Sequence, residues 1–365
     1  MAPAHRDVTI GDVARRAGVS RAQTARALGG YGAVSDAVHS RVQAAADALG
    51  YRANSLARSV STGRSQSVGV VVGDIENPFF ALSVRGISDT LQDAGYDVVL
   101  MNTGESPDRE MEAVRALDAK RMDGFLVAPA IAPSFLHLQS LIDAGRPLVL
   151  FDRDAPGVGA PSVVVDVEDA ARELADALVA AGHRRIGFVS TLSHPSAEWN
   201  KDAPIAHTPV GRRLFAVDRA LQRHDLALQP ENVRMGARGG EDIRRHVREL
   251  VTGEQPATTL LASDAVIAVA ALEEFQSLGL SVPHDVSLAV FDDPPWAGLV
   301  SPPLTVVSQP VLEAAKAAAG LLLDAMAGRT PATRPALAAH LVQRRSIGPV
   351  RAAREAHQES RRVRR

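Results

Sequence analysis

From Ser67 onward, short apolar runs rich in β-branched residues alternate with stretches of helical periodicity. Such runs, when joined by helices, are typical of parallel strands buried on both faces, so they predict an α/β fold with doubly wound sheets. The alternation occurs in two series, which predicts two lobes with a ligand in the cleft between them. The strands are predicted at 68–72, 96–102, 123–129, 147–152 and 162–166, then at 185–190, 232–236, 258–263 and 286–292, with a last one near 340–345. The helices are predicted near 79–94, 107–120, 133–144, 168–182, 211–224, 240–252, 264–278 and 310–327.

Ahead of the first strand, residues 8–28 contain two short helical patterns that meet at Gly18. Each pattern starts with a hydroxyl residue and has a carboxylate or amide three positions later, the spacing of a capping box. Two short helices joined by a glycine turn are typical of a helix-turn-helix, whose second helix reads the DNA major groove. A tight hairpin in an all-helical protein has the same pattern and remains an alternative. The two pairs are Thr9 with Asp12 and Ser20 with Gln23, and Ser35 is expected to cap a third helix that ends at Gly50.

The charge distribution separates this N-terminal part from the rest of the chain. Residues 1–65 contain nine Arg and no Lys against four Asp, a net charge of +5, within a chain whose net charge is −2. A small cationic module suits a polyanionic partner such as DNA. The chain has no cysteine, which excludes disulfides, thiolate metal sites and a cysteine nucleophile. We expect no cofactor or metal, and the lack of a signal pattern and of a long apolar run predicts a cytoplasmic protein.

Six short motifs occur in order along the chain: VTIGDVARRAGVS from Val8, VSDAVHSRVQAAADALGYRAN at 34–54, NPFF at 77–80, GHRRIGF at 182–188, VPHDVSLAVFDD at 282–293 and PPLTVVSQP at 302–310. Together they resemble the lactose-repressor/galactose-repressor family of bacterial transcription regulators. The resemblance covers nearly the whole chain, from Val8 to Ser346. It implies a dimeric repressor that binds a near-palindromic operator. It also implies a two-lobed, periplasmic-binding-protein-like core with a small effector, a sugar or sugar derivative, in its cleft.

The patterns and the resemblance together divide the chain into four parts. We expect a helix-turn-helix domain at 1–53, a hinge helix or linker at 54–66, an effector-binding core at 67–348 and a disordered basic tail at 349–365. Within the core, the first lobe is predicted at about 67–166 and 308–332, and the second at about 167–307 and 333–348.

The resemblance also assigns the residues that contact DNA. Arg21, Ala22 and Arg26 fall where family members contact bases, and arginine can pair bidentately with guanine. For Arg21 a phosphate contact or a solvated charge is the alternative, and Ser20 and Gln23 are expected to hold phosphates. The predicted DNA-binding residues are Thr9, Ser20, Arg21, Ala22, Gln23, Arg26, Tyr31, Asn54, Ala57, Arg58 and Val60.

Residues 54–60 match the hinge helix of the family, which folds on the operator and wedges an apolar side chain into the minor groove. The wedge is usually leucine, and this chain has the smaller Val60, so we expect a shallower insertion. Taken without the resemblance, the polar, glycine-containing stretch 54–67 is either a flexible linker or a segment that becomes ordered only on DNA.

For a polyhydroxylated ligand, planar bidentate groups, carboxylates and an aromatic face are expected. Family positions supply all three, although Phe79 and Phe80 could equally be core residues, and Arg213 with Asp292 could form an interlobe ion pair. The chain departs from the family at Val167 and Ser263, where asparagine is common. The predicted effector-binding residues are Asn77, Phe79, Phe80, Asp152, Arg153, Asp166, Arg213, Asp264 and Asp292.

Three other functions compete with an effector-controlled repressor. An enzyme is disfavoured because no dinucleotide-binding glycine motif, P-loop or H-E-x-x-H occurs, and His183 is expected to be structural. A transport-type binding protein is disfavoured by the cationic module. A regulator that no longer senses a small molecule stays open, given Val167 and Ser263. The loop at 192–211 departs from the family, and its Trp199 is expected either to stack on a sugar or to be exposed.

Overall fold

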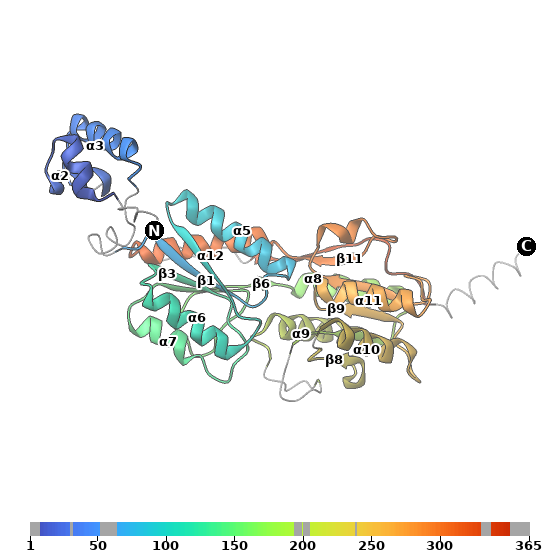
Figure 1. Cartoon of the computed structure of the whole chain (residues 1–365). Coiled ribbons are helices and arrows are strands. Elements are labelled where there is room, and N and C mark those ends of the chain that lie inside the picture. The colour runs from blue at the N-terminus through green and yellow to red at the C-terminus, as the bar shows by residue number, and fades with distance from the viewer. Residues whose placement is uncertain are drawn as a thin grey trace, which may run out of the picture. The chain divides into compact units, whose positions relative to one another are not determined.

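The computed structural model describes residues 8–29, 32–51, 64–192, 199, 205–237, 239–329 and 337–350. The chain divides into two compact units (Figure 1). The first unit contains Met1–Ser67 and Lys120–Asp123, and the second contains Val68–Ala119 and Gly124–Arg365. No helix in the described part of the chain is both long and apolar enough to cross a bilayer.

The first unit is built from α1 (Ile10–Ala17), α2 (Arg21–Gly29) and α3 (Asp36–Leu49). The predicted capping box at the start of α1 is present, because Asp12 N–H donates to Thr9 Oγ1 and Thr9 N–H donates to Asp12 Oδ2. Gly18 turns the chain between α1 and α2 at a φ of 64°, which costs glycine nothing. Ser35 precedes α3 as predicted, but its side chain makes no capping hydrogen bond. The core of the unit contains Val13, Ala17, Ala27, Val42, Ala45 and Ala46, with Tyr51 packed against it.

The first lobe of the second unit has a five-stranded sheet in the order β2-β1-β3-β4-β5, which is the doubly wound order expected. Because alternate residues face opposite sides of a strand, Val68 and Val70 of β1 pack with α5 and α12, whereas Gly69 faces Leu117 of α6. A Cβ on Gly69 would lie 2.8 Å from Leu117 Cδ1. The strands are β1 (Ser67–Val72), β2 (Asp97–Asn102), β3 (Gly124–Val127), β4 (Leu148–Phe151) and β5 (Ser162–Val163). The helices are α5 (Pro78–Asp93), α6 (Pro107–Ala119), α7 (Leu136–Asp143) and α12 (Val311–Met326).

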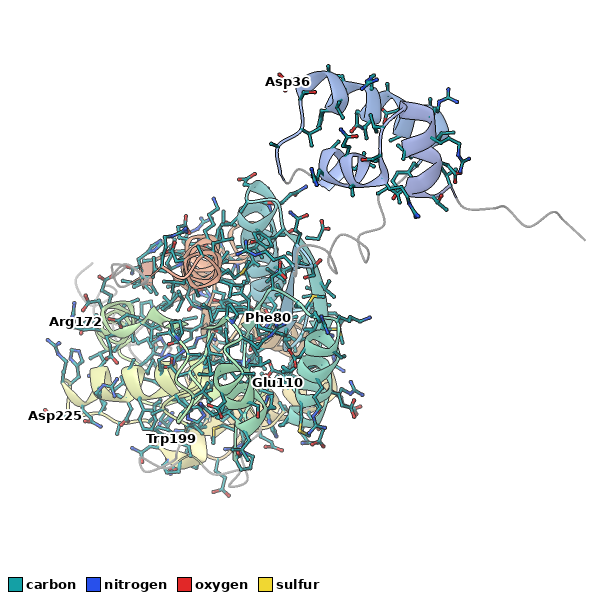
Figure 2. All side chains as sticks on the ribbon, turned by 90° about the vertical axis from the view of Figure 1, so that its left-hand side faces the viewer. Asp36, Phe80, Glu110, Arg172, Trp199 and Asp225 are labelled. Carbon is teal, nitrogen blue, oxygen red and sulfur yellow. The ribbon has the colours of Figure 1, made fainter. Side chains whose placement is uncertain are left out.

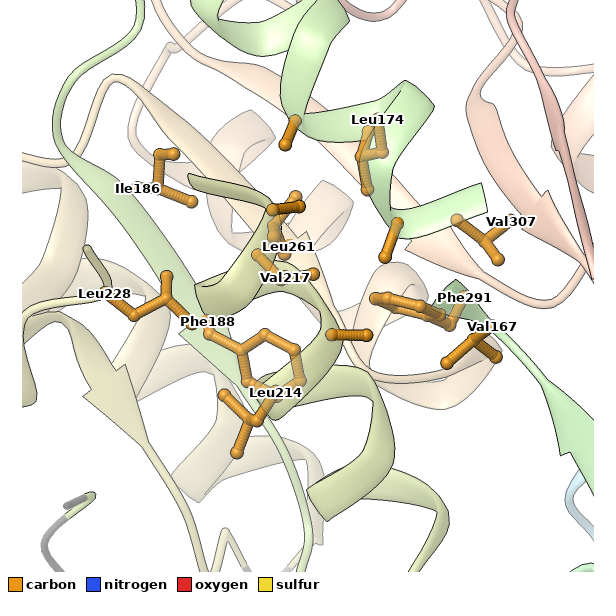
Figure 3. Close-up of a cluster of buried hydrophobic side chains, with 14 of the residues drawn as sticks. Val167, Leu174, Ile186, Phe188, Leu214, Val217, Leu228, Leu261, Phe291 and Val307 are labelled. Atoms are coloured by element: carbon orange, nitrogen blue, oxygen red, sulfur yellow. The ribbon is translucent and has the colours of Figure 1, made fainter. Parts of the chain in front are cut away.

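The second lobe has a six-stranded sheet in the order β13-β11-β10-β9-β7-β8, in which only the edge strand β13 is antiparallel to its neighbour. Phe188 and Phe291 face α8 and α9, in the cluster that Figure 3 shows, whereas Leu260 and Val290 face α10 and α11. The strands are β7 (Ile186–Val189), β8 (Val233–Arg234), β9 (Thr259–Ala262), β10 (Ser287–Phe291), β11 (Thr305–Ser308) and β13 (His340–Val342). The helices are α8 (Glu168–Ala180), α9 (Pro209–Gln222), α10 (Gly239–Thr252) and α11 (Ala265–Ser277), with short 3₁₀ turns at Pro230–Asn232 and Pro295–Gly298.

The chain passes between the lobes more than once. The single strand predicted at 162–166 is wrong, because β5 ends at Val163 and β6 (Val165–Asp166) leaves the sheet to pair with β12 (Leu337–Ala338). After β11 the chain returns to the first lobe as α12, which packs on α5 through small residues. A Cβ on Gly86 of α5 would lie 2.9 Å from Ala315 Cβ, so glycine permits this close approach. The first lobe is therefore assembled from sequence-distant segments.

Candidate functional site

Helix α2 has one buried side and one exposed side. Thr24 is fully buried and Ala27 nearly so, and the Thr24 hydroxyl donates to Ser20 O at 3.0 Å. The predicted capping box at Ser20 is present, because Gln23 N–H donates to Ser20 Oγ at 3.2 Å and Ser20 N–H donates to Gln23 Oε1 at 3.1 Å. The exposed side carries the residues predicted to read bases, namely Arg21, Ala22 and Arg26.

A glycine that the sequence motifs did not single out lies beside Arg26. Gly32 has a φ of 76°, and a Cβ there would lie 3.2 Å from Arg26 Cδ. The loop after α2 thus leaves room for the arginine stem to lie across it. Glycine is favoured where φ is positive, so the sequence G-Y-G at 30–32 was the signal that could have predicted this turn. Five of the predicted DNA-binding residues lie outside the described part of the chain: Tyr31, Asn54, Ala57, Arg58 and Val60.

The chain that follows the predicted hinge is held by one carboxylate. Asp123 accepts hydrogen bonds from Ser65 N–H at 2.8 Å and from Gln66 N–H at 2.9 Å. Gln66 adopts a φ of 53°, an uncommon conformation that these two bonds help to stabilise. Asp123 was missed because its partners are more than 50 positions away in the sequence.

In the core, two aspartates occupy equivalent positions at the carboxyl ends of strands. Asp152 follows β4 with a φ of 66°, and Asp292 follows β10 with a φ of 78°. Both have left-handed backbone conformations, which aspartate tolerates better than most residues. Burial raises the pKa of each carboxyl group above its ordinary value, and neighbouring arginines only partly oppose this.

Arg213 holds the carboxylate of Asp292 within the second lobe. It lies on α9, its Nη1 donates to Ser263 O, and its Nη2 lies 3.8 Å from Asp292 Oδ1. Its guanidinium carbon lies 5.3 Å from the centre of the Phe291 ring. Gln309 Nε2 donates to the same carboxylate oxygen of Asp292. The ion pair considered as an alternative therefore exists, but both partners belong to one lobe.

Arg153 is fixed in the first lobe. Its two terminal nitrogens lie 2.5 Å and 2.6 Å from the Glu105 carboxylate oxygens, its Nε donates to Asp152 Oδ2 at 3.1 Å, and its Nη1 donates to Pro129 O at 3.1 Å. Its guanidinium carbon lies 5.8 Å from the centre of the Phe80 ring. Burial lowers the pKa of Arg153, but Glu105 and Asp152 outweigh it, so the net pKa is raised.

A cavity of about 20 Å³ lies between the two lobes. Since a water molecule needs about 10–15 Å³ of such space, this cavity has room for about one water molecule. Polar groups in the lining of this cavity come from both lobes. Its apolar groups include Val167, which stands where the family commonly has asparagine. The side chains that bear on function are Phe79, Ser83, Asp152, Arg212, Arg213 and Gln309.

The predicted effector residues divide into two groups. Phe79, Asp152 and Arg213 line this cavity, and Asp292 contacts Arg213 and Gln309 at its edge. The others have local contacts: Asn77 caps α5 by accepting from Phe79 N–H, Asp264 caps α11 by accepting from Val266 N–H and Ile267 N–H, and Asp166 accepts from Glu168 N–H. Phe80 is 3% exposed in the first-lobe core, and Arg153 is bound by Glu105. A ligand role for each of the nine stays a prediction.

Three functional candidates were missed, and one expectation was wrong. Arg212, Gln309 and Glu105 were not singled out, although Arg212 adjoins Arg213 and Gln309 lies within a quoted motif. Trp199 is neither exposed nor placed for stacking on a ligand. It is 1% exposed and packs edge-on against Phe215, with ring centres 5.1 Å apart. Figure 2 labels Trp199 among the side chains of the second unit.

His183 is structural, as expected from its position between α8 and β7. Its Nε2 lies 3.1 Å from Gly348 O, which can only accept, so Nε2 carries the proton and Nδ1 accepts from Thr258 Oγ1 at 2.8 Å. Burial lowers the pKa of His183 to about 4, although the bond to Gly348 opposes the shift. Among the described residues, no group of three or more His, Asp or Glu side chains is placed to hold a metal ion.

Comparison with known families yields two matches. A model described as "Bacterial regulatory proteins, lacI family" matches residues 9–54, and one described as "Periplasmic binding protein-like domain" matches residues 175–347. The chain is 31% identical to the HTH-type transcriptional repressor CytR of Escherichia coli K12 over 324 residues, which is 88% of this chain and 90% of CytR.

Solved structures agree with the observed architecture. The lac repressor dimer bound to operator and the anti-inducer ONPF aligns with a TM-score of 0.78 at 22% identity, covering 94% of this chain and 100% of that one. A LacI family transcriptional regulator from Lactobacillus casei with bound sucrose aligns with a TM-score of 0.65 at 28% identity, covering 77% of this chain and 99% of the other. The expected fold class, a helix-turn-helix followed by a two-lobed α/β core, is confirmed.

Proposed function

Because the chain belongs to the lacI family of bacterial regulatory proteins, we propose that it represses transcription as a homodimer on a near-palindromic operator, under control of a small effector in the interlobe cleft. It is a DNA-binding transcriptional regulator of that family. Beyond this family membership, we propose that the protein is a dimer, that its operator is near-palindromic, and that its effector is a sugar or sugar derivative. The proposal places the protein on DNA in the bacterial cytoplasm.

The observation that carries the proposal is the exposed arginine face of α2. The helix starts at a complete capping box and buries Thr24 and Ala27, so its outer face is held in one orientation. A helix presented in this way enters the major groove with its first turns against the bases. Selection of bound DNA from a random pool tests the proposal. It predicts a site with two inverted half-sites, and recovery of no shared sequence contradicts it.

Replacing Arg26 with alanine is expected to weaken binding to the selected site by about 1–3 kcal/mol, because a bidentate contact to guanine is lost. The variant is also expected to relax the base preference at one position in each half-site. Arg41→Ala is the matched control, since Arg41 is also exposed in the first unit but lies on α3. Competition binding with single-base variants of the site provides the measurement. An unchanged base preference for Arg26→Ala would show that this arginine only contacts phosphate.

The chemistry of the cleft supports a polar, neutral effector. Two buried carboxylates with raised pKa values, Asp152 and Asp292, offer acceptors for hydroxyl groups, and Arg213 offers donors. Phe79 supplies an aromatic surface in the same lining. The similar regulator from Lactobacillus casei was solved with sucrose bound, which supports a sugar as the ligand class here.

A second candidate is a regulator that represses without sensing a small molecule. The cavity of about 20 Å³ is too small for a sugar ring unless the lobes separate, and Val167 presents an apolar surface to it. Calorimetry against a panel of sugars and nucleosides, together with binding to the selected site, distinguishes the two. Heat from any ligand supports the first candidate. No heat from a preparation that binds DNA supports the second.

The exposed apolar side chains support the homodimer. Leu82 on α5 is 40% exposed, and Val266 and Val269 on α11 are 40% and 43% exposed. A surface groove of about 330 Å³ lies against α11 and includes Pro78 at the start of α5. Water-exposed apolar side chains on a groove are typical of an association surface, and on this basis we place the dimer interface on α5 and α11.

Val269→Asp is expected to convert the dimer to a monomer, because a carboxylate would have to be desolvated at the interface. Light scattering coupled to gel filtration measures the mass directly. Leu136→Asp is the matched control: Leu136 is 74% exposed at the start of α7, away from the predicted interface. A Val269→Asp variant that keeps the mass of the wild type would contradict this interface, and a stable tetramer would contradict the predicted dimer.

A further inference from the structure

One arginine connects the two lobes through polar contacts at the cavity. Arg212 lies on α9 of the second lobe, and its Nη2 donates to Asp152 O of the first lobe. Its Nη1 lies 3.5 Å from the carboxylate of Asp154, also in the first lobe. The same Nη1 donates to His207 O at 2.9 Å, within its own lobe. The guanidinium thus bridges the lobes at the edge of the space in which an effector would bind.

The segment that Arg212 contacts in the first lobe is rigidly held. Arg153, between the two acceptor residues, is bound by both carboxylate oxygens of Glu105 and by Pro129 O. The residue after Pro129 is fixed in turn, because Ala130 N–H donates to the buried carboxylate of Glu110 at 2.5 Å. Figure 2 labels Phe80 and Glu110 in this lobe. Because Arg153, between Asp152 and Asp154, has its own partners in the first lobe, we expect this segment to stay with the first lobe if the lobes separate.

The helix that carries Arg212 is held equally well. Gly211 N–H donates to Thr208 Oγ1 at 3.0 Å, and the Thr208 hydroxyl donates to Ile205 O at 2.7 Å. A Cβ on Gly211 would lie 1.9 Å from Ile205 O, so this tight turn requires glycine. Arg213, the residue after Arg212, donates a hydrogen bond to Ser263 O and pairs with Asp292. Arg212 therefore joins two well-held surfaces through a single side chain.

We propose that Arg212 is a positioning residue that latches the two lobes together and sets how readily the cleft opens to admit an effector. Opening the cleft requires the guanidinium to give up Asp152 O and Asp154 together. A ligand that enters must offer Arg212 replacement acceptors or leave its partly buried charge with His207 O alone, which is unfavourable. The latch itself is a property of the fold, whereas its role in regulation rests on the function proposed above.

The absence of cysteine allows a direct test on the full-length protein. Spin labels on Ala116→Cys in α6 and Glu241→Cys in α10, both at exposed positions, report the distance between the lobes by double electron–electron resonance. No ligand or DNA is added. We expect one narrow distance population in the wild-type background. In Arg212→Met, which keeps the aliphatic stem, we expect the ratio of open to closed forms to rise about tenfold, in keeping with the loss of a charged hydrogen bond.

Two further variants make the test decisive. Arg219→Met is the control, because Arg219 lies on the same helix but pairs with Glu168 of the same lobe, and it is expected to keep the wild-type distance distribution. Asp154→Asn removes only the ion pair at a side chain that is 44% exposed, so it is expected to fold and to open the cleft less than Arg212→Met does. Wild-type distributions in every Arg212 and Asp154 variant that folds would overturn the latch. Since this readout needs neither operator nor effector, it can fail while the proposed function holds, and the reverse is equally possible.

Discussion

Replacing Arg213 with methionine is expected to lower the free energy of unfolding by about 3–5 kcal/mol, because it leaves a buried carboxylate without its cationic partner. Asp292 is 8% exposed and would keep only the hydrogen bond from Gln309. Ser263 O would lose its donor at the same time. Urea unfolding at neutral pH, followed by circular dichroism, measures the loss.

The control for this prediction is Arg219→Met, which removes an exposed ion pair with Glu168 on the same helix and is expected to cost less than about 1 kcal/mol. The double variant Arg213→Met/Asp292→Asn is expected to recover much of the loss, because the uncompensated charge is gone. A cost for Arg213→Met as small as that of the control would mean that water reaches Asp292. Asp292 would then no longer support the proposed effector site as a buried acceptor.

Acid is expected to destabilise the protein through His183, by up to about 3 kcal/mol between pH 6.5 and pH 4. The pKa of His183 falls from 6.5 in the unfolded chain to about 4 in the folded protein. Between these values the unfolded chain binds the proton and the folded protein does not, so stability is lost as the pH falls through this range. His183 is 1% exposed, and protonated Nδ1 would have to break its bond from the Thr258 hydroxyl.

His183→Asn isolates this contribution from those of other groups. Burial also lowers the pKa of His207 and His246, whereas it raises the pKa of Asp152 and Asp292, so the whole protein sums shifts of both signs. The variant is expected to be less stable than the wild type at pH 7, and the difference should shrink as the pH approaches 4. Unfolding free energies measured at several pH values give that difference. A constant difference would contradict a neutral, buried His183.

Much of the fold could be predicted from local sequence patterns. The apolar runs at 68–72 and 286–292 became β1 and β10 with nearly the same bounds, because a strand buried on both faces leaves a continuous apolar signal. The run at 162–166 did not, because β6 pairs with β12, some 170 residues away, and no local pattern encodes such a partner. For the same reason Asp123 was not predicted as a hydrogen-bond acceptor, because its donors Ser65 and Gln66 are remote in the sequence.

The sequence predicted which types of residue occur near the cleft better than it predicted what each of them contacts. Arg212 and Arg213 are identical neighbours in the sequence, and only the rotation of α9 decides that one pairs with Asp292 and the other reaches the first lobe. Asn77 and Asp264 could have been recognised as helix caps, since each directly precedes a helix and both residue types favour that position. Trp199 could not be placed, because its partner Phe215 is contributed by α9.

The path of the chain between the lobes has a consequence for synthesis on the ribosome. The last strand of the first sheet ends at Val163, but α12, which covers one face of that sheet with Ala315, Ala318 and Leu322, ends at Met326. At about 5–20 residues per second, the apolar face waits on the order of ten seconds for its cover. During that time most of the second lobe is being made, all but its edge strand β13, while the N-terminal helices have their complete core. The nascent chain is therefore expected to need chaperone protection at the first lobe, not at its N-terminal helices.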